Sequence, residues 1–226
     1  MKKTTTFTTL AFLAFTFGHR VLAQTAAGGH ERRVPQTCSE LPAGQKRPDF
    51  GCFIVASSKG MQFSRSETYW HLQKFPSRAR AEDAKGPNGL VLEDQGHFWL
   101  SELGPDDIAP RGGDPAVILG PLELPSAKSY DAQIGYAVFR PGDRSPVHTH
   151  PGPEAWYMLA GDQCLETPNG TKKAKVGETM SVEAGVPMEL SIAGSTVRRS
   201  FFLVIHDSAK GWVEDSDWKP TGACGK

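Results

Sequence analysis

GDRSPVHTHPGPEAWYMLAG, residues 142–161, contains the most informative residue pattern of the chain. One residue separates His148 from His150, so on a strand, where side chains alternate between faces, both imidazoles point to the same side. The Pro-Gly-Pro run at 151–153 cannot hold a regular ladder and predicts a tight three-residue reversal. Glu154 then begins a return strand opposite His150. The stretch therefore predicts a hairpin on which two imidazoles and one carboxylate converge.

Three side chains of these types can hold a metal ion. The return strand at 155–159 is apolar and aromatic, so Glu154 should be buried, and a buried carboxylate needs a cation or a hydrogen-bond partner. Nitrogen from His148 and His150 and oxygen from Glu154 suit Fe, Mn, Ni, Co, Zn or Cu without selecting among them. We predict a divalent transition metal at these three residues. Without a metal, Glu154 is a candidate general base beside two imidazoles.

The spacing of these residues also resembles the first motif of the cupin superfamily. Gly142, His148, His150, Glu154 and Gly161 fill all five positions of that motif. The resemblance implies an all-β protein built on a cupin-type double-stranded β-helix, the RmlC-like jelly-roll barrel, with the ligands projecting into its interior. Because this fold carries many activities, the function has to be argued from the site.

The second cupin motif is degenerate in this chain. Counted from Gly177, its second glycine falls on Gly185, whereas Glu183, Met188 and Ile192 stand where proline, histidine and asparagine are expected. The usual fourth ligand is thus replaced by Met188. A thioether ligand would favour copper, but methionine also fills irregular space in a core. Met188 therefore remains open as a fourth ligand or as packing.

Two classes of function fit these observations. The intact first motif favours a metal-dependent enzyme acting on a small organic molecule, because two histidines and one carboxylate leave coordination positions open. An oxidoreductase of the dioxygenase kind comes first, and an isomerase or lyase second. Loss of the second-motif histidine favours the alternative, a non-catalytic cupin that binds a small ligand or a metal. A closed structural zinc site is less suitable, because such sites normally have four protein ligands.

The amino terminus has the pattern of a bacterial secretory signal peptide. Two lysines at positions 2 and 3 precede an apolar region at 7–17, and small residues lead to Ala23. We predict cleavage after Ala23, a periplasmic or secreted protein, and no membrane association of the mature chain. The apolar region is too short to span a membrane.

Four cysteines, at positions 38, 52, 164 and 224, would then lie in an oxidising compartment where disulfides persist. Three pairings are compatible with the sequence. Cys38 and Cys224 lie in irregular sequence near the two ends, so we expect disulfides that tie down the tails. Cys164 lies in a strand-like run and is equally well interpreted as a free buried thiol.

Composition limits the partners. The chain has 25 basic and 25 acidic residues, which argues against nucleic-acid binding, and its 24 glycines and 17 prolines suit a turn-rich β protein. We expect a small-molecule ligand or substrate and no nucleic acid, and a homodimer is left open.

The chain divides into five predicted segments. These are a signal peptide (1–23), a linker (24–48), a β-rich extension (49–125) that is alternatively a degenerate cupin, the cupin barrel (126–208) and a C-terminal tail packed on the outside (209–226). One short helix is predicted at 77–85, with Ser77 as N-cap and Gly86 in the left-handed position after it. Strands are predicted at 53–56, 69–75, 89–93, 97–103, 116–124, 132–139, 163–166, 180–182, 188–192 and 200–205.

Other residues have weaker claims to function. By alternation, Trp156 and Met158 share the inward face of Glu154 and Tyr157 faces outward. Arg198 and Arg199 fit either an anionic substrate or a solvated strand edge. Three further histidines are interpreted as structural or solvated: His71, His97 and His206.

Overall fold

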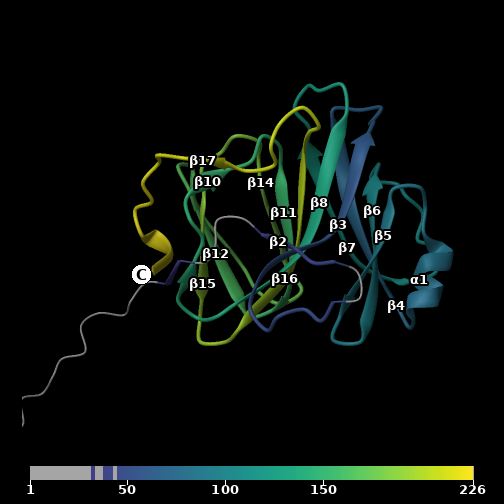
Figure 1. Cartoon of the computed structure of the whole chain (residues 1–226), viewed down its shortest axis with the longest axis horizontal. Coiled ribbons are helices and arrows are strands. Elements are labelled where there is room, and N and C mark those ends of the chain that lie inside the picture. Colours follow the sequence, from purple (N-terminus) through teal and green to yellow (C-terminus); the bar gives the residue numbers. More distant parts are fainter. Residues whose placement is uncertain (1–31, 34–37, 43–44, 226) are drawn as a thin grey trace, which may run out of the picture. The chain divides into compact units, whose positions relative to one another are not determined.

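Strands dominate the part of the chain that the computed structural model describes, residues 32–33, 38–42 and 45–225 (Figure 1). They are β1 (Arg32–Arg33), β2 (Ser39–Glu40), β3 (Gly51–Met61), β4 (Glu67–Phe75), β5 (Gly89–Asp94), β6 (His97–Gly104), β7 (Asp114–Glu123), β8 (Tyr130–Phe139), β9 (Asp143–Arg144), β10 (His148–Thr149), β11 (Glu154–Ala160), β12 (Asp162–Thr167), β13 (Gly170–Ala174), β14 (Thr179–Val182), β15 (Glu189–Ala193), β16 (Arg198–Asp207) and β17 (Glu214–Asp215). The helices are α1 (Arg78–Ala84) and the short 3-10 helix η1 (Ala223–Gly225). Every strand predicted from the sequence overlaps one of these, and the predicted all-β class is confirmed.

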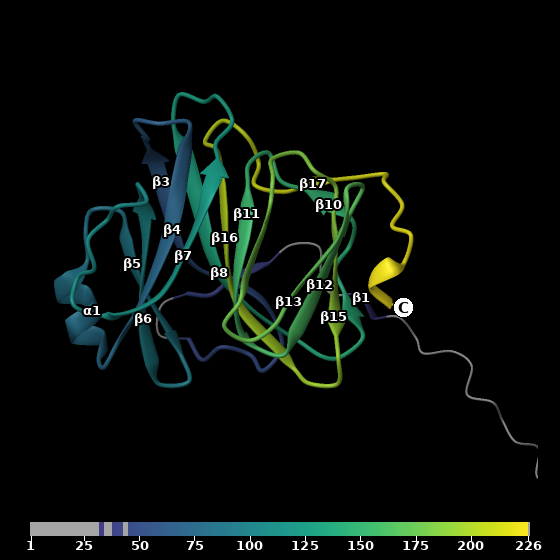
Figure 2. The same cartoon turned by 180° about the vertical axis from the view of Figure 1, so that it is seen from behind.

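Two sheets face each other and form the barrel. One has the strand order β1-β9-β15-β12-β13 and the other β14-β11-β16-β8-β3-β2. In Figure 2, β12, β13 and β15 of the first sheet stand beside β11 and β16 of the second. Between them lies an apolar cluster that includes Trp156, Met158, Met188 and Phe202. Some of its members, among them Trp156 and Phe202, line the cavity next to the motif residues.

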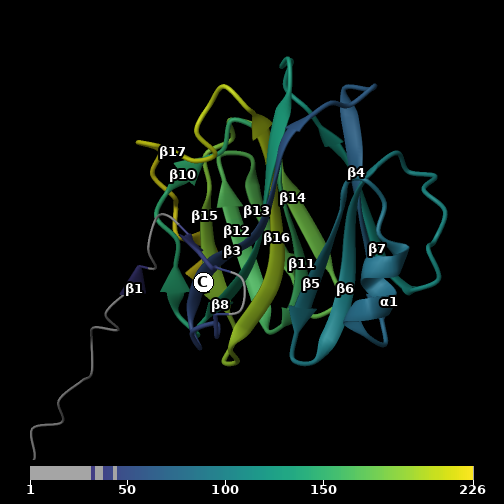
Figure 3. The same ribbon diagram turned by 45° about the vertical axis from the view of Figure 1, so that its right-hand side comes forward.

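A third sheet covers the outer face of the six-stranded barrel sheet. Its strand order is β5-β6-β4-β7 (Figure 3). A second apolar cluster containing Trp70, Trp99 and Leu203 fills the space between the two sheets. The central strand β16 is therefore buried on both faces, which explains why its run 201–205 is apolar without interruption. Tyr157 points to this outer cluster, as alternation predicted, and its ring lies 5.5 Å from that of Trp99.

The helix α1 begins as predicted but ends differently. The Ser77 hydroxyl accepts from the backbone N–H of Arg80, as expected of an N-cap. At the other end, Lys85 leaves in an extended conformation, and Gly86 does not adopt the predicted left-handed conformation. A β-carbon at this position would crowd the side-chain ends of Glu102 and Arg111, which would have to shift.

The predicted hairpin between His150 and Glu154 is wrong. Strand β10 pairs with β17 and forms a bridge to Met188, whereas β11 pairs with β14 and β16. The segment 151–153 thus carries the chain from one side of the barrel mouth to the other. Proline suits this crossing because it cannot extend a ladder, and Gly152 lies so close to the Ile205 carbonyl that no β-carbon fits.

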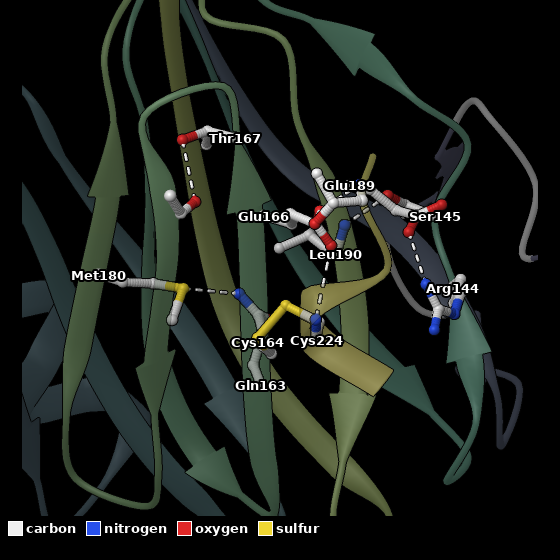
Figure 4. Close-up of a disulfide and its surroundings, with 12 residues drawn as sticks. Arg144, Ser145, Gln163, Cys164, Glu166, Thr167, Met180, Glu189, Leu190 and Cys224 are labelled. Atoms are coloured by element: carbon white, nitrogen blue, oxygen red, sulfur yellow. Dashed lines mark hydrogen bonds and ion pairs between the residues drawn. A yellow bond between two sulfur atoms is a disulfide. The ribbon is translucent and has the colours of Figure 1, made fainter. Parts of the chain in front are cut away.

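Two disulfides join Cys38 to Cys52 and Cys164 to Cys224, and no described cysteine is free. The interpretation of Cys164 as a free thiol is wrong, because η1 brings Cys224 against β12 (Figure 4). The disulfides suggest an oxidising, extracellular or periplasmic compartment. The predicted signal peptide and cleavage site lie outside the described residues. No helix in the described ranges has the length and apolar character needed to cross a membrane.

The predicted segment boundaries stay a prediction. The region 67–123 supplies the third sheet and α1.

Candidate metal centre

Backbone groups of other residues hold both the main chain and the imidazole of His148. Its N–H and carbonyl pair with Met188 at 3.2 and 2.9 Å, which anchors the short strand β10 at the barrel mouth. The Nδ1 atom lies 2.8 Å from the Pro146 carbonyl oxygen. Because a carbonyl oxygen can only accept, Nδ1 carries the proton and donates it, and Nε2 is left with a lone pair for a metal.

His150 is held in the same way by a distant segment. Its Nδ1 donates to the backbone carbonyl of Trp212, and its ring stacks on the Trp212 indole at 5.5 Å between centroids. The His148 and His150 rings lie 5.0 Å apart and nearly perpendicular to each other. Both imidazoles are therefore oriented by acceptors on Nδ1, the arrangement common behind metal-binding histidines.

Glu154 completes the group. The ligand atoms of His148, His150 and Glu154 all lie within 4.8 Å of one another, and the three residues are 8%, 2% and 5% exposed. The Nε2 atom of His150 and Oε2 of Glu154 are 2.9 Å apart, and neither atom has another hydrogen-bond partner. When the Nδ1 proton is hydrogen-bonded to the Trp212 carbonyl, Nε2 of a neutral His150 presents a lone pair to the Glu154 carboxylate oxygen. Two acceptors this close repel each other unless a proton or a cation lies between them.

The residues present fit a transition metal. Two ligand atoms bonded to one metal ion at about 2.0–2.2 Å, roughly at right angles, lie about 3 Å apart. This is close to the 2.9 Å between Nε2 of His150 and Oε2 of Glu154. The three residues could hold a metal. That they do so stays a prediction.

The pKa values of the two histidines are shifted in opposite directions. Burial lowers the pKa of His148, and the charge of Glu154 offsets this only in part. Burial also acts to lower the pKa of His150, but the adjacent Glu154 carboxylate and the Trp212 carbonyl outweigh it, so the pKa of His150 is raised above 6.5. His150 is therefore the group from which an arriving cation would displace a proton.

The three residues open into a cavity of about 50 Å³ inside the barrel. Its walls are mostly apolar, and Trp156 lines it, as alternation predicted. The other lining residues are Cys38, Cys52, Ala137, Phe139, Ser145, Pro146, Leu190, Arg198, Phe202, Trp212 and Val213. A space of this size admits a few water molecules or a very small organic molecule.

The segment 208–225, here called the C-terminal strap, lies across the barrel mouth. The sequence predicted a tail on the outside, but Trp212 and Val213 line the cavity, and β17 pairs with β10. At its end, Thr221 donates to Glu166 and Cys224 is joined to Cys164 (Figure 4). Nothing in the local sequence relates Trp212 to His150, which lies 62 positions earlier. The strap is the part of the site that sequence reasoning missed.

Met188 is fully buried and belongs to the apolar cluster inside the barrel. Its backbone positions His148. As a fourth ligand it remains untested.

The remaining candidate histidines lie elsewhere. His71 donates from Nε2 to the Pro105 carbonyl at 2.7 Å, His97 is exposed, and His206 bonds through Nδ1 to the Asp207 carbonyl. None of the three lines the cavity among the described residues. The two arginines of β16 point to opposite faces of the strand. Arg199 forms an ion pair with Asp94 at 2.8 Å, whereas Arg198 points into the barrel. The solvated-edge interpretation is wrong for Arg198, which is 1% exposed.

No protein-family model and no curated protein sequence matches the chain. Solved structures do match. The structural neighbours are cupin proteins, at low identity. The chain is similar to a cupin-like protein from Thermotoga maritima, with 20% identity, a TM-score of 0.34, and coverage of 41% of this chain and 67% of that one.

Two other neighbours are similar over comparable lengths. An RmlC-like cupin from Methanocaldococcus jannaschii has 20% identity, a TM-score of 0.31 and coverage of 32% of this chain and 67% of its own. The DMSP lyase DddQ from Ruegeria pomeroyi DSS-3 has 18% identity, a TM-score of 0.30 and coverage of 40% and 42%. These likenesses are partial and weak, and they show nothing about the chemistry of this chain.

Proposed function

We propose that this protein is an exported, metal-dependent enzyme of the cupin kind that acts on a small organic molecule. His148, His150 and Glu154 would hold a divalent transition metal. One observation carries the proposal: Nε2 of His150 and Oε2 of Glu154 are buried and 2.9 Å apart, and neither atom has another hydrogen-bond partner. A cation between them would satisfy both atoms.

A bound ion would supply Lewis acidity or a position for dioxygen, and three protein ligands would leave that position open. This favours oxygenase-like chemistry, followed by isomerase or lyase chemistry. The chain's own residues would orient and enclose the substrate. Pro146 and Trp212 fix the two imidazoles through their carbonyls, while Trp156 and Phe202 exclude water from the cavity.

A second candidate is a protein that binds a small ligand or a metal without turnover. Two observations favour it: Met188 replaces the histidine expected in the second motif, and the cavity of about 50 Å³ is small. Oxygen consumption or product formation by the metal-loaded protein with a panel of small organic acids, amides and alcohols distinguishes the two. Binding without turnover across that panel favours the second candidate.

Metal analysis of protein purified from its native compartment tests the site. We expect about one ion per chain in the wild type, and at least a tenfold loss of affinity in His148→Ala and Glu154→Gln, because each removes a ligand. His97→Ala is the matched control, since His97 is exposed and outside the cavity. Equal metal content in all four proteins would exclude the proposed site.

Met188→Leu uses the same measurement to examine the fourth position. Because the Met188 side chain belongs to the apolar cluster, we expect metal content and affinity to stay unchanged. A changed affinity or a different bound metal would instead identify the thioether as a ligand.

A further inference from the structure

Arg198 is a buried cation at the edge of the candidate site. It begins β16, is 1% exposed, and lines the same cavity as His148 and Glu154. Its Nη2 donates to the Gln163 side-chain oxygen, and its guanidinium lies 5.5 Å from the centre of the Phe139 ring. The Nε and Nη1 atoms have no hydrogen-bond partner. An arginine offers five donors, so most of its hydrogen-bonding capacity is unused.

No carboxylate among the described residues forms an ion pair with Arg198. The neighbouring Arg199 shows what this chain does elsewhere, because it meets both oxygens of Asp94 at 3.1 and 2.8 Å. Burial lowers the pKa of Arg198 to about 9, and the charge of Glu154 offsets this effect in part. A buried cation without a counter-ion is costly, so an anion is the group that would complete this end of the cavity.

The place of Arg198 relative to the metal ligands is set by strand register. Glu154 pairs with Val204, which is roughly 20 Å from Arg198 along β16 at about 3.3 Å per residue. The long side chain of Arg198 nevertheless reaches the cavity that Glu154 lines. The guanidinium and Glu154 therefore face the same cavity, although Glu154 lies on β11 opposite the other end of β16.

We propose that Arg198 binds the carboxylate of the substrate, which makes a small organic carboxylic acid the substrate class of this site. The part of this inference that concerns the metal rests on the proposed function, whereas the part that concerns anion binding by Arg198 does not. A carboxylate matches the planar donor set of a guanidinium. The small cavity with mostly apolar walls suits a carboxylate on a short carbon chain better than a phosphate, which needs more donors.

The test uses full-length, metal-free protein, so that its result is independent of the metal. Acetate is the probe and acetamide, which has a similar shape without charge, is its neutral partner. Titration by carbon-13 NMR of labelled acetate at about pH 8, below the pKa of about 9 for Arg198, should show acetate binding and no acetamide binding. Arg198→Met should weaken acetate binding at least tenfold. Arg80→Met makes the same change at an exposed site outside the cavity and should leave binding unchanged.

Two further variants separate this inference from the proposed function and from misfolding. Arg198→Lys keeps a charge and should retain part of the acetate affinity, with the wild-type circular dichroism spectrum. His148→Ala should lose metal but keep acetate binding, while Arg198→Met should keep metal and lose acetate. No acetate binding by the wild type, or equal binding by wild type and Arg198→Met, would overturn the inference and leave the metal proposal intact.

Discussion

Removing the disulfide between Cys164 and Cys224 should weaken both the fold and the metal centre. This bond anchors the end of the C-terminal strap to β12 (Figure 4), and the same strap carries Trp212, whose carbonyl orients His150. The perturbation is the double variant Cys164→Ala/Cys224→Ala. Alanine avoids placing a new polar group at Cys164, which is fully buried.

The expected loss of stability follows from the loop that the bond closes. The two cysteines are 60 positions apart, and for a loop of this length the chain-entropy relation gives about 4 kcal/mol at 25 °C. The other disulfide closes 14 positions, for which the same relation gives about 3 kcal/mol. In a domain of this size a loss of 4 kcal/mol lowers the melting temperature by roughly 8–16 °C.

Urea unfolding of the metal-free proteins measures the first effect, and competition with a chelator measures the second. Loss of an acceptor behind a ligating histidine typically weakens metal binding about 10–100-fold. Cys38→Ala/Cys52→Ala is the matched control, because it removes a disulfide that anchors β3 and leaves the strap attached. We expect it to destabilise the fold by a similar amount with a smaller loss of metal affinity. If the strap variant unfolds like the wild type, or holds metal as tightly as the control, the strap does not support the site.

Three other outcomes are expected. Metal binding near neutral pH should release a proton, because the pKa of His150 is raised above 6.5. Calorimetry in two buffers of different ionisation enthalpy measures the number of protons released. Identical proton release by Glu154→Gln would contradict the role of the Glu154 carboxylate in raising this pKa. In the metal-free protein the same raised pKa stabilises the fold below about pH 6.5, and this contribution is lost as the pH rises through the folded-state pKa. Gly152→Ala should cost about 3 kcal/mol in urea unfolding, because its β-carbon would collide with the Ile205 carbonyl. Gly142→Ala, at φ 80° but with open space around it, should cost only about 1 kcal/mol, and equal losses would argue against the close approach.

The three candidate ligands could be predicted because their convergence depends on short spacings. His148 and His150 face the same side on a strand whatever that strand pairs with, so the wrong pairing did not misplace them. The hairpin failed because a sequence gives the length of a turn but not whether the next strand returns beside the first or crosses to another sheet. Here the crossing is decided by β14 and β16, which take both edges of β11.

Arg198 shows a signal that was present in the sequence but was not used. Positions 202 and 204 of β16 face the barrel interior, and Arg198 has the same parity, whereas Arg199 shares the parity of Phe201 and faces the other sheet. Alternation alone would therefore have separated the two arginines. It could not have shown that Arg198 lacks a counter-ion, because that depends on which side chains the opposite sheet presents.

The strap is different, because no local pattern could have placed it. Its contact with His150 joins residues far apart in sequence and depends on β17 pairing with β10 and on a disulfide at its far end. This arrangement has a thermodynamic consequence. If docking of the strap tightens metal binding by a given factor, bound metal must favour the docked, oxidised strap by the same factor. We therefore expect the metal-loaded protein to resist reduction of Cys164–Cys224 more than the metal-free protein does, by the affinity ratio that the chelator competition measures. Equal reduction equilibria in the two forms, together with a weakened metal site in the double variant, would mean that the variant had perturbed the barrel itself and not the docking of the strap.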